Sequence, residues 1–270
     1  MNGFKIGIAV TIFAFAVNCG AQQANAPAKT AEKDIAAESA DSTIDSVLNR
    51  LSEKTAKLTS FQADIEYLFV QDPELLDART MQKGIFYYKK YSDRSKIRID
   101  FKTRKIDDED EEKYFEQVIF DGCWLARIDH QLKTAKYDQQ APPDKPVEAF
   151  EFVGRSFPLI GFTKIDELKD NYEIKIAGQE TAAPVDPDKP IVLHLEPKKT
   201  SKYSKDFALV QLKIDNKLFL PVRLVTQTPE GDQYMIKLSN VAINKNIEND
   251  VFNVEPPEDF VQDRRSLEDK

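Results

Sequence analysis

The sequence has few of the residues that carry redox, metal or nucleophilic chemistry. Only two cysteines and two histidines occur among its 270 residues. Neither His130 nor His194 has a cysteine or a second histidine at metal-ligand spacing. Gly-x-Ser-x-Gly elbows, phosphate-binding loops and Gly-rich dinucleotide fingerprints are also absent. The sequence therefore favours a binding protein without metal or cofactor over an enzyme.

Basic residues are also fewer than acidic residues. The chain carries 38 Lys and Arg against 46 Asp and Glu, a formal net charge of −8. Because binding to phosphate backbones needs clustered basic residues, we expect no nucleic-acid partner. The hydrophobic share of 41% and the charged share of 31% are typical of a globular domain with a wet surface.

Residues 1–21 have the pattern of a signal peptide. Lys5 precedes an apolar run at residues 6–17 that is too short to span a membrane, so the pattern predicts export with cleavage after Ala21. Alternatively, Cys19 is the lipidated cysteine of a degenerate lipobox, and residues 22–41, rich in Ala and polar residues, form a flexible tether. Either way no internal disulfide can form, and we expect Cys123 to be a small buried apolar residue.

Residues 42–261 are expected to form one domain, followed by a tail at 262–270. The domain begins with an amphipathic helix, because one apolar stripe with helical spacing contains Ile44, Val47, Leu48, Leu51 and Leu58. Between residues 61 and 69 the period changes to two, which is the pattern of a half-buried strand. One helix feeding consecutive strands predicts a curved sheet with an apolar face and a helix lying across it.

The alternation of period two recurs along the chain and gives about eleven strands. Asp121-Gly122 is the strongest two-residue hairpin signal between them. Because strands do not alternate with helices, the sheet should be antiparallel. Residues 147–168 include an unusually apolar stretch at 157–162 and are expected to form a second helical lid. The predicted fold class is therefore mainly β (α+β).

Four stretches, in this order, resemble the LolA family, the periplasmic carriers of outer-membrane lipoproteins. Residues 47–62 (VLNRLSEKTAKLTSFQ) resemble its N-terminal helix and first strand, and GIFYYKK at 84–90 resembles its Gly-x-Leu-Trp-x-Lys strand. Phe120-Asp121-Gly122 resembles its Asp-Gly-Lys hairpin. The closing run, from Leu220-Pro221 through YMIKLSNVAINKNIENDVF to Pro256-Pro257, is the most specific. Two positions depart from the family: Trp124 comes early, and Lys90 stands where the family has an arginine linked to cargo release.

The resemblance implies an incomplete antiparallel β-barrel wrapped around helices that cover a hydrophobic cavity for acyl chains. It further implies a monomer in the periplasm, whose partners are acylated lipoproteins or lipids, an inner-membrane ABC-type releasing complex and an outer-membrane acceptor. Lys90 takes the cargo-transfer position. We expect the lid to contain Leu48, Leu51, Phe157 and Ile160, and the acyl-binding cavity to be lined by Phe61, Ile65, Phe69, Tyr87, Ile97, Ile99, Phe101, Trp124, Leu193, Leu195, Leu224 and Ile236.

Three alternatives stay open. The protein is a membrane-tethered lipid or lipoprotein acceptor if Cys19 is acylated. It is a sensor or scaffold if the same fold binds a partner protein. Alternation also cannot separate a filled interior from one that holds a ligand, so each of the expected cavity residues has packed core as its competing interpretation.

Overall fold

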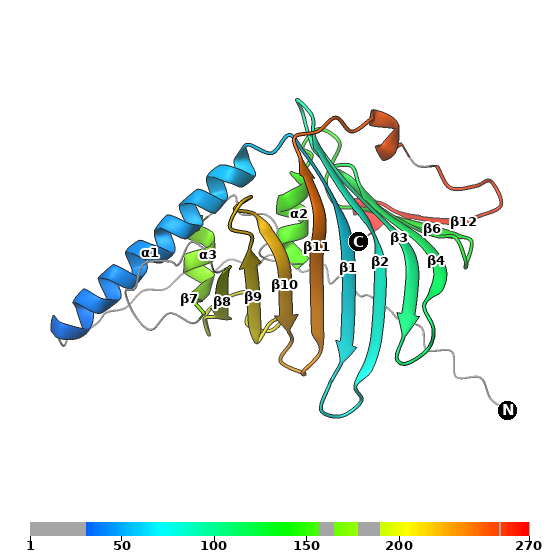
Figure 1. The fold of residues 1–270 in the computed structure, drawn as a ribbon. Coiled ribbons are helices and arrows are strands. Elements are labelled where there is room, and N and C mark those ends of the chain that lie inside the picture. Colours follow the sequence, from blue (N-terminus) through cyan, green and yellow to red (C-terminus); the bar gives the residue numbers. More distant parts are fainter. Residues whose placement is uncertain (1–30, 157–164, 178–189, 254, 270) are drawn as a thin grey trace.

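Alternating apolar strands assemble into one curved sheet with two free edges (Figure 1). The computed structural model describes residues 31–156, 165–177, 190–253 and 255–269. The strand order is β12-β6-β5-β4-β3-β2-β1-β11-β10-β9-β8-β7. Since the end strands β12 and β7 do not pair with each other, the barrel is incomplete, and the predicted fold class is confirmed. The strands are β1 (Ser60–Gln71), β2 (Ala78–Lys90), β3 (Ser95–Ile106), β4 (Glu112–Phe120), β5 (Trp124–Asp129), β6 (Thr134–Gln139), β7 (Tyr172–Ile176), β8 (Ile191–Pro197), β9 (Leu209–Ile214), β10 (Pro221–Gln227), β11 (Gln233–Ile243) and β12 (Val261–Arg265).

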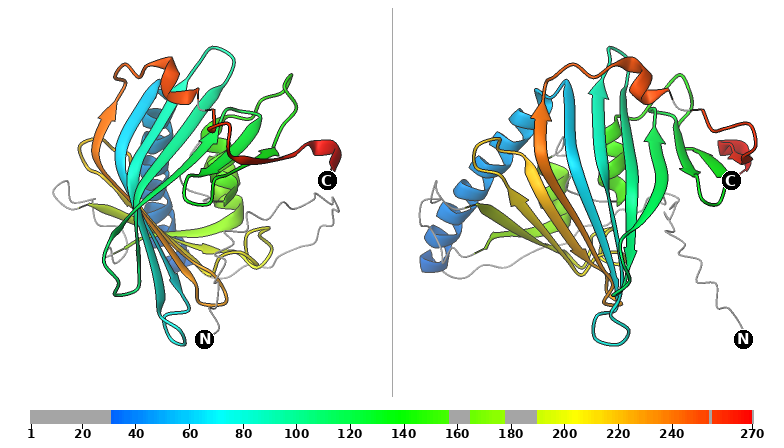
Figure 2. Two further views of the ribbon diagram at one scale, coloured as in Figure 1. Left: turned by 90° about the vertical axis from the view of Figure 1, so that its right-hand side faces the viewer. Right: turned by 45° about the vertical axis from the view of Figure 1, so that its right-hand side comes forward.

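Three helices lie on the concave side of the sheet, as two further views show (Figure 2). They are α1 (Ala31–Ala56), α2 (Ala149–Ser156) and α3 (Ile165–Asn171). Two 3-10 turns, η1 (Asn249–Phe252) and η2 (Leu267–Asp269), follow the last long strand. The second lid element expected at residues 147–168 corresponds to α2 and the start of α3, while residues 157–164 lie outside the described ranges.

The two ends of the chain differ from the sequence-based expectation. Helix α1 begins at Ala31, within the segment expected to be a tether, because its first part, AEKDIAAESADS, is rich in strong helix formers. The expected tail at 262–270 contains most of β12, which pairs with β6 in parallel. The sheet therefore has twelve strands and one parallel pair, where about eleven antiparallel strands were expected.

The Asp121-Gly122 hairpin is present with a longer loop than expected. Strand β4 ends at Phe120 and β5 begins at Trp124, so Cys123 also belongs to the turn. Asp121 Oδ1 accepts hydrogen bonds from the backbone N–H groups of Cys123 (2.8 Å) and Trp124 (2.7 Å), and Gly122 has a φ of +98° that favours glycine. Cys123 is buried, as predicted, and burial raises the pKa of its thiol.

Gly84 allows a close approach of β2 and β3 in the middle of the sheet. The β2–β3 register shifts between Lys83 and Gly84. A Cβ atom at Gly84 would lie 1.8 Å from the carbonyl oxygen of Asp100 on β3, so any side chain there would push the two strands apart. This close approach is the physical reason for a glycine in the GIFYYKK stretch.

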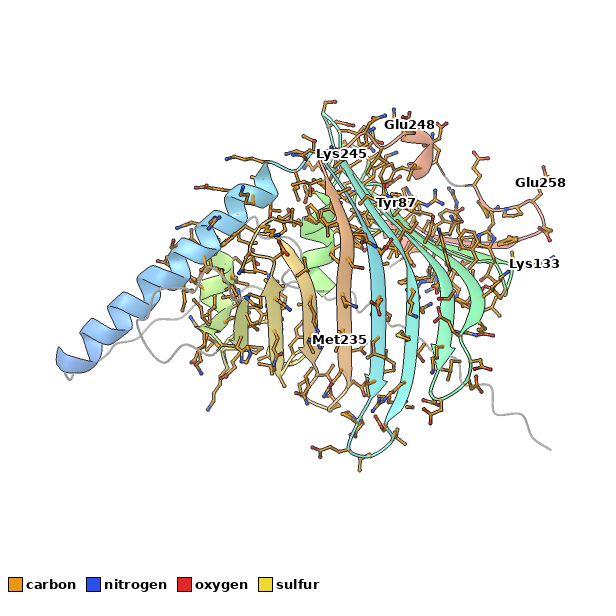
Figure 3. The ribbon with its side chains drawn as sticks, in the orientation of Figure 1. Tyr87, Lys133, Met235, Lys245, Glu248 and Glu258 are labelled. Carbon is orange, nitrogen blue, oxygen red and sulfur yellow. The ribbon has the colours of Figure 1, made fainter. Side chains whose placement is uncertain are left out.

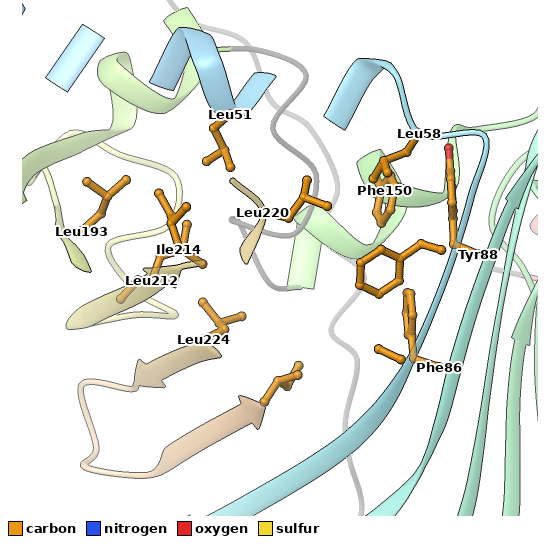
Figure 4. Packing of buried hydrophobic residues seen from close by; sticks show 14 of the residues in the cluster. Leu51, Leu58, Phe86, Tyr88, Phe150, Leu193, Leu212, Ile214, Leu220 and Leu224 are labelled. Carbon is orange, nitrogen blue, oxygen red and sulfur yellow. The ribbon is translucent and has the colours of Figure 1, made fainter. Parts of the chain in front are cut away.

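The concave face is solidly packed at the end of the sheet formed by β8–β10. Leu48 and Leu51 of α1 and Leu193, Leu212 and Ile214 of the strands are all 0% exposed. Figure 4 shows Leu51 over Leu193, Leu212, Ile214 and Leu220. We call this the filled half of the interior.

A smaller apolar cluster lies on the outer face, at the β12 edge. It contains Ile119, Ala126, Ile128 and Ala135, with Tyr137 and Phe260 packed against it. The C-terminal segment is fixed there by Phe260, by the β12–β6 pairing and by the ion pair between Lys133 Nζ and Asp259 (2.6 Å). This segment therefore covers apolar surface.

Candidate ligand-binding cavity

A cavity of about 830 Å³ lies on the concave side of the sheet, between α2 and the strands β1–β5, β10 and β11. Its size falls within the range of about 300–1,000 Å³ that is typical of small-molecule sites. We call this part of the interior the hollow half. Its apolar lining consists of Leu58, Phe61, Ile65, Tyr67, Phe69, Phe86, Ile97, Ile99, Phe101, Val118, Phe120, Leu125, Phe150, Phe152, Val153, Phe207, Leu220, Leu224, Ile236 and Leu238, with the aliphatic residues Pro221 and Val222 beside them.

Most of the residues expected at the cavity wall are among its lining. Strand β1 contributes Phe61, Ile65 and Phe69, and the other expected residues at the wall are Ile97, Ile99, Phe101, Leu224 and Ile236. They come from the neighbouring strands β3, β1, β11 and β10, so the period-two alternation places them on one face.

Tyr87 is not at the wall. Phe86 and Tyr88 on either side of it belong to the buried interior, and the pleat turns Tyr87 to the outer face, where it is labelled in Figure 3. There Tyr87 pairs across the sheet with Arg98 of β3, and burial together with the charge of Asp100 raises the pKa of its hydroxyl. The expectation was wrong because residues 85–88 are all apolar or aromatic. No polar residue in this run shows which side chains face outward, so the sequence does not reveal which of them face the interior.

Trp124 is also on the outer face. It precedes Leu125, which lines the cavity, and follows the same phase as the outer-face residues Ala126 and Ile128. The Arg264 guanidinium of β12 lies 5.6 Å from the Trp124 ring centroid, within cation–π range. The C-terminal segment covers this face of β5, so the expectation that Trp124 lines the cavity is wrong.

Leu193, Leu195, Leu48 and Leu51 belong to the filled half. All four are 0% exposed and none lines the cavity. They belong to the packed core beneath α1, together with Leu212 and Ile214. The other two expected lid residues, Phe157 and Ile160, lie outside the described ranges.

The aromatic residues that hold α2 in place were missed. Phe120 stacks on Phe152 with ring centroids 4.0 Å apart, and Tyr88 stacks on Phe150 at 4.1 Å. Phe86, Phe120, Phe150 and Phe152 all line the cavity. The alternation along the strands could have identified Phe86 and Phe120 as inward-facing residues. The sequence gives no such signal for Phe150 and Phe152, because the way in which a short helix such as α2 packs on the sheet decides which of its side chains face the cavity.

Glu148 fixes the N-terminus of α2. Its Oε2 accepts hydrogen bonds from the backbone N–H groups of Phe150 (2.7 Å) and Glu151 (3.1 Å). Its Oε1 accepts from the hydroxyls of Ser95 (2.7 Å) and Tyr88 (3.1 Å). A carboxylate that caps a helix and also binds two strands ties the cover of the cavity to its wall.

A band of polar residues crosses the otherwise apolar wall. It consists of Tyr67, Gln82, Glu116 and Arg127, which come from β1, β2, β4 and β5 and all line the cavity. Glu116 Oε1 lies 3.1 Å from Arg127 Nε, and Gln82 Nε2 donates to Glu116 Oε2 at 3.1 Å. Burial raises the pKa of the Tyr67 hydroxyl, and the nearby Tyr234 and Glu116 raise it further. We call these four residues the polar band.

Two further expectations concern single residues. Lys90 is exposed at the end of β2, where its backbone N–H donates to the Thr59 carbonyl at 2.8 Å. Its side chain is far along the strand from the polar band. Cys19 lies outside the described residues, together with the whole expected signal peptide.

The described ranges contain no group of three His, Cys, Asp or Glu residues that could hold a metal ion. Within these same ranges, no helix has the length and apolar composition needed to cross a membrane. His130 lies on the outer side, with its ring centroid 4.3 Å from that of Phe115, and burial lowers its pKa. The interior thus offers apolar contact and a few hydrogen-bonding groups.

Comparison with known proteins gives structural neighbours only. No family model matches the chain, and no curated protein matches it significantly. A LolA superfamily protein from Nitrosomonas europaea is similar in structure, at 11% identity over 78% of this chain and 98% of that chain, with a TM-score of 0.32. Mycobacterium tuberculosis lipoprotein LppX is similar at 11% identity over 77% of this chain and 98% of that chain, with a TM-score of 0.40.

The Pseudomonas aeruginosa MucA/MucB complex is similar as well, at 16% identity over 81% of this chain and 61% of that chain, with a TM-score of 0.44. A lipoprotein-sorting protein domain from Vibrio parahaemolyticus is a further structural neighbour. The curved open sheet, its helical cover and its cavity form an incomplete barrel. Identities and TM-scores this low give no information on what this chain binds.

Proposed function

We propose that this protein binds the acyl chains of lipids or lipoproteins in the hollow half and carries them through the periplasm towards the outer membrane. The observation that supports this proposal is the cavity of about 830 Å³, whose wall is mainly aromatic and aliphatic. Ligand-binding cavities of this size are typically lined by hydrophobic and aromatic side chains, with a few polar groups that fix the orientation of the ligand.

Burial of hydrocarbon supplies enough free energy for such binding. Each methylene removed from water contributes about 0.8 kcal/mol, so about ten buried methylenes contribute about 8 kcal/mol before the costs of association. No covalent step is needed, because recognition of a chain requires only apolar contact. A carrier must also release its cargo, and the short helix α2, which covers part of the cavity, is an element that could move to release it.

The first test measures binding. Delipidated protein is titrated with a fluorescent fatty-acyl probe, and unlabelled fatty acid is then added in competition. We expect a saturable fluorescence increase with one site per chain, reversed by the competitor. Absence of saturable binding would contradict the proposal, and a tight complex with a protein partner but no extractable lipid would favour the sensor or scaffold alternative.

The second test concerns the N-terminus. Mass spectrometry of the processed protein from its native host distinguishes a free carrier, with an unmodified terminus at Gln22, from a tethered acceptor, with a diacylglyceryl group on Cys19. For the free carrier we further propose the partners implied by the family resemblance, an inner-membrane ABC-type releasing complex and an outer-membrane acceptor. Substitution of the exposed Lys90 should then change transfer between membranes and leave probe affinity unchanged.

A further inference from the structure

The polar band places charged and hydrogen-bonding side chains in a cavity wall that is otherwise apolar, although hydrocarbon needs only apolar contact. Glu116 and Arg127 form an ion pair with side chains only 13% and 34% exposed. Taking charges out of water costs free energy that an apolar pair of similar volume would avoid, so a half-buried pair adds little to stability. The next inward-facing residues along β4 and β5, Val118 and Leu125, are apolar. Apolar side chains therefore fit this part of the wall, and the ion pair between Glu116 and Arg127 is not needed to build it.

Hydrogen-bond donors of the band have capacity left for a ligand. The guanidinium of Arg127 has five N–H donors, more than its contact with Glu116 uses. Tyr67 also lines the cavity, and its hydroxyl is a further donor; burial raises the pKa of that hydroxyl.

The polar groups lie along the wall beyond the aromatic cover of α2. Phe120, which stacks on Phe152, pairs with Leu125 in an apolar row beneath α2. Arg127 is in the next inward row, Glu116 is one row further, and Tyr67 pairs with Gln82 beyond that. The wall beneath α2 is therefore apolar, and the polar band crosses the middle of the wall.

The charged residues of the lining disfavour an anion. Arg127 is already paired with Glu116. The other charged residues of the lining are the two bases Lys205 and Arg223 and the three acids Asp206, Glu230 and Asp232. A carboxylate head group would lose hydration among more negative than positive charges. An uncharged acceptor, such as an ester carbonyl or a hydroxyl, pays no such cost.

We infer that the cavity binds its ligand in one orientation, with an uncharged, ester-type head group against the polar band and the hydrocarbon along the apolar remainder of the wall. This inference rests on the proposed function, since it specifies how an acyl ligand is held. It assigns Tyr67 and Arg127 as the residues that recognise the head group, with Glu116 and Gln82 positioning the guanidinium. It also makes an acylglycerol-type ligand a better fit than a free fatty acid.

The test is competition against the fluorescent acyl probe by three ligands with the same hydrocarbon chain: monopalmitoylglycerol, palmitate and hexadecane. The wild-type protein should bind monopalmitoylglycerol about tenfold more tightly than either of the others, as expected for one or two hydrogen bonds to a charged donor. The double variant E116M/R127M should lose this preference while hexadecane binds as before. The single variant Y67F should lose about half of the preference on a logarithmic scale and should fold as the wild type does.

The control is E66M/K237M, which removes the cross-strand ion pair between Lys237 Nζ and Glu66 Oε1 (2.6 Å) on the outer face and should leave the preference intact. Thermal unfolding of each variant checks that it is folded. Equal binding of all three ligands by the wild type, or a preference that survives in both Y67F and E116M/R127M, would overturn the orientation while leaving acyl binding in place. Failure of every ligand to displace the probe would instead overturn the proposed function itself.

Discussion

The filled half and the hollow half of the interior are built from the same sheet and the same alternation of apolar residues, yet only one of them is solid. In the filled half, Leu51 of α1 lies directly on Leu212 and Ile214, and all three are 0% exposed. In the hollow half, Ile99 and Val118 are only half-buried and line the cavity. The alternation along the strands therefore does not determine which half is solid.

We expect the largest loss of stability when a side chain forces β2 and β3 apart at the wall of the hollow half. Gly84→Ala would place a Cβ atom 1.8 Å from a carbonyl oxygen of β3, in the wall of the cavity. We expect the free energy of unfolding to fall by more than about 3 kcal/mol, measured by urea denaturation. A loss below about 1 kcal/mol would show that β2 and β3 separate easily and that their close approach does not depend on glycine.

The filled half should behave as ordinary packed core. Leu212→Ala removes a fully buried side chain and leaves a void, so we expect a loss of about 3 kcal/mol in the free energy of unfolding. Affinity for the acyl probe, measured at a temperature where the variant is folded, should be unchanged. A loss of affinity larger than the loss of stability would mean that the ligand occupies the filled half.

The hollow half should respond in the opposite way when its space is filled. Val118→Phe adds volume at a half-buried position of the wall. We expect affinity for the acyl probe to fall about tenfold, which is about 1.4 kcal/mol, with thermal stability unchanged or raised. The matched change Val210→Phe in the filled half, where Val210 is 0% exposed, should lower stability instead. Equal stability losses for the two variants would argue that both halves are solid.

The smallest effect is expected at the cap of α2. Glu148→Ala removes the acceptor for two helix N–H groups and for the hydroxyls of Ser95 and Tyr88, at a cost of about 1 kcal/mol in stability. Since the cap ties α2 to the wall, the dissociation rate of the acyl probe should rise. Glu148→Gln keeps an acceptor oxygen and should retain most of the wild-type rate. An unchanged rate in Glu148→Ala would mean that the ligand leaves by a route that does not involve α2.

The sequence predicted the curved antiparallel sheet and most of one wall of the cavity, because a period of two assigns side chains to faces without tertiary information. It could not separate Leu193 and Leu195, which are packed core, from Ile97 and Ile99, which line the cavity. Both pairs alternate identically, so the alternation does not distinguish them. Tyr87 was misplaced because an uninterrupted aromatic run hides the phase of the strand. Strand β12 was missed because all its side chains are exposed, so no apolar period marks it.

Photo-cross-linking with a diazirine-labelled acyl chain, followed by mass spectrometry of the peptides, tests the central claim most directly. We predict that the label attaches to peptides of β1, β3, β4 and α2 that contain cavity residues such as Ile65, Ile99 and Val118, and that monopalmitoylglycerol competes it away. Labelling confined to the outer face, or to the filled half around Leu51 and Leu212, would contradict the account.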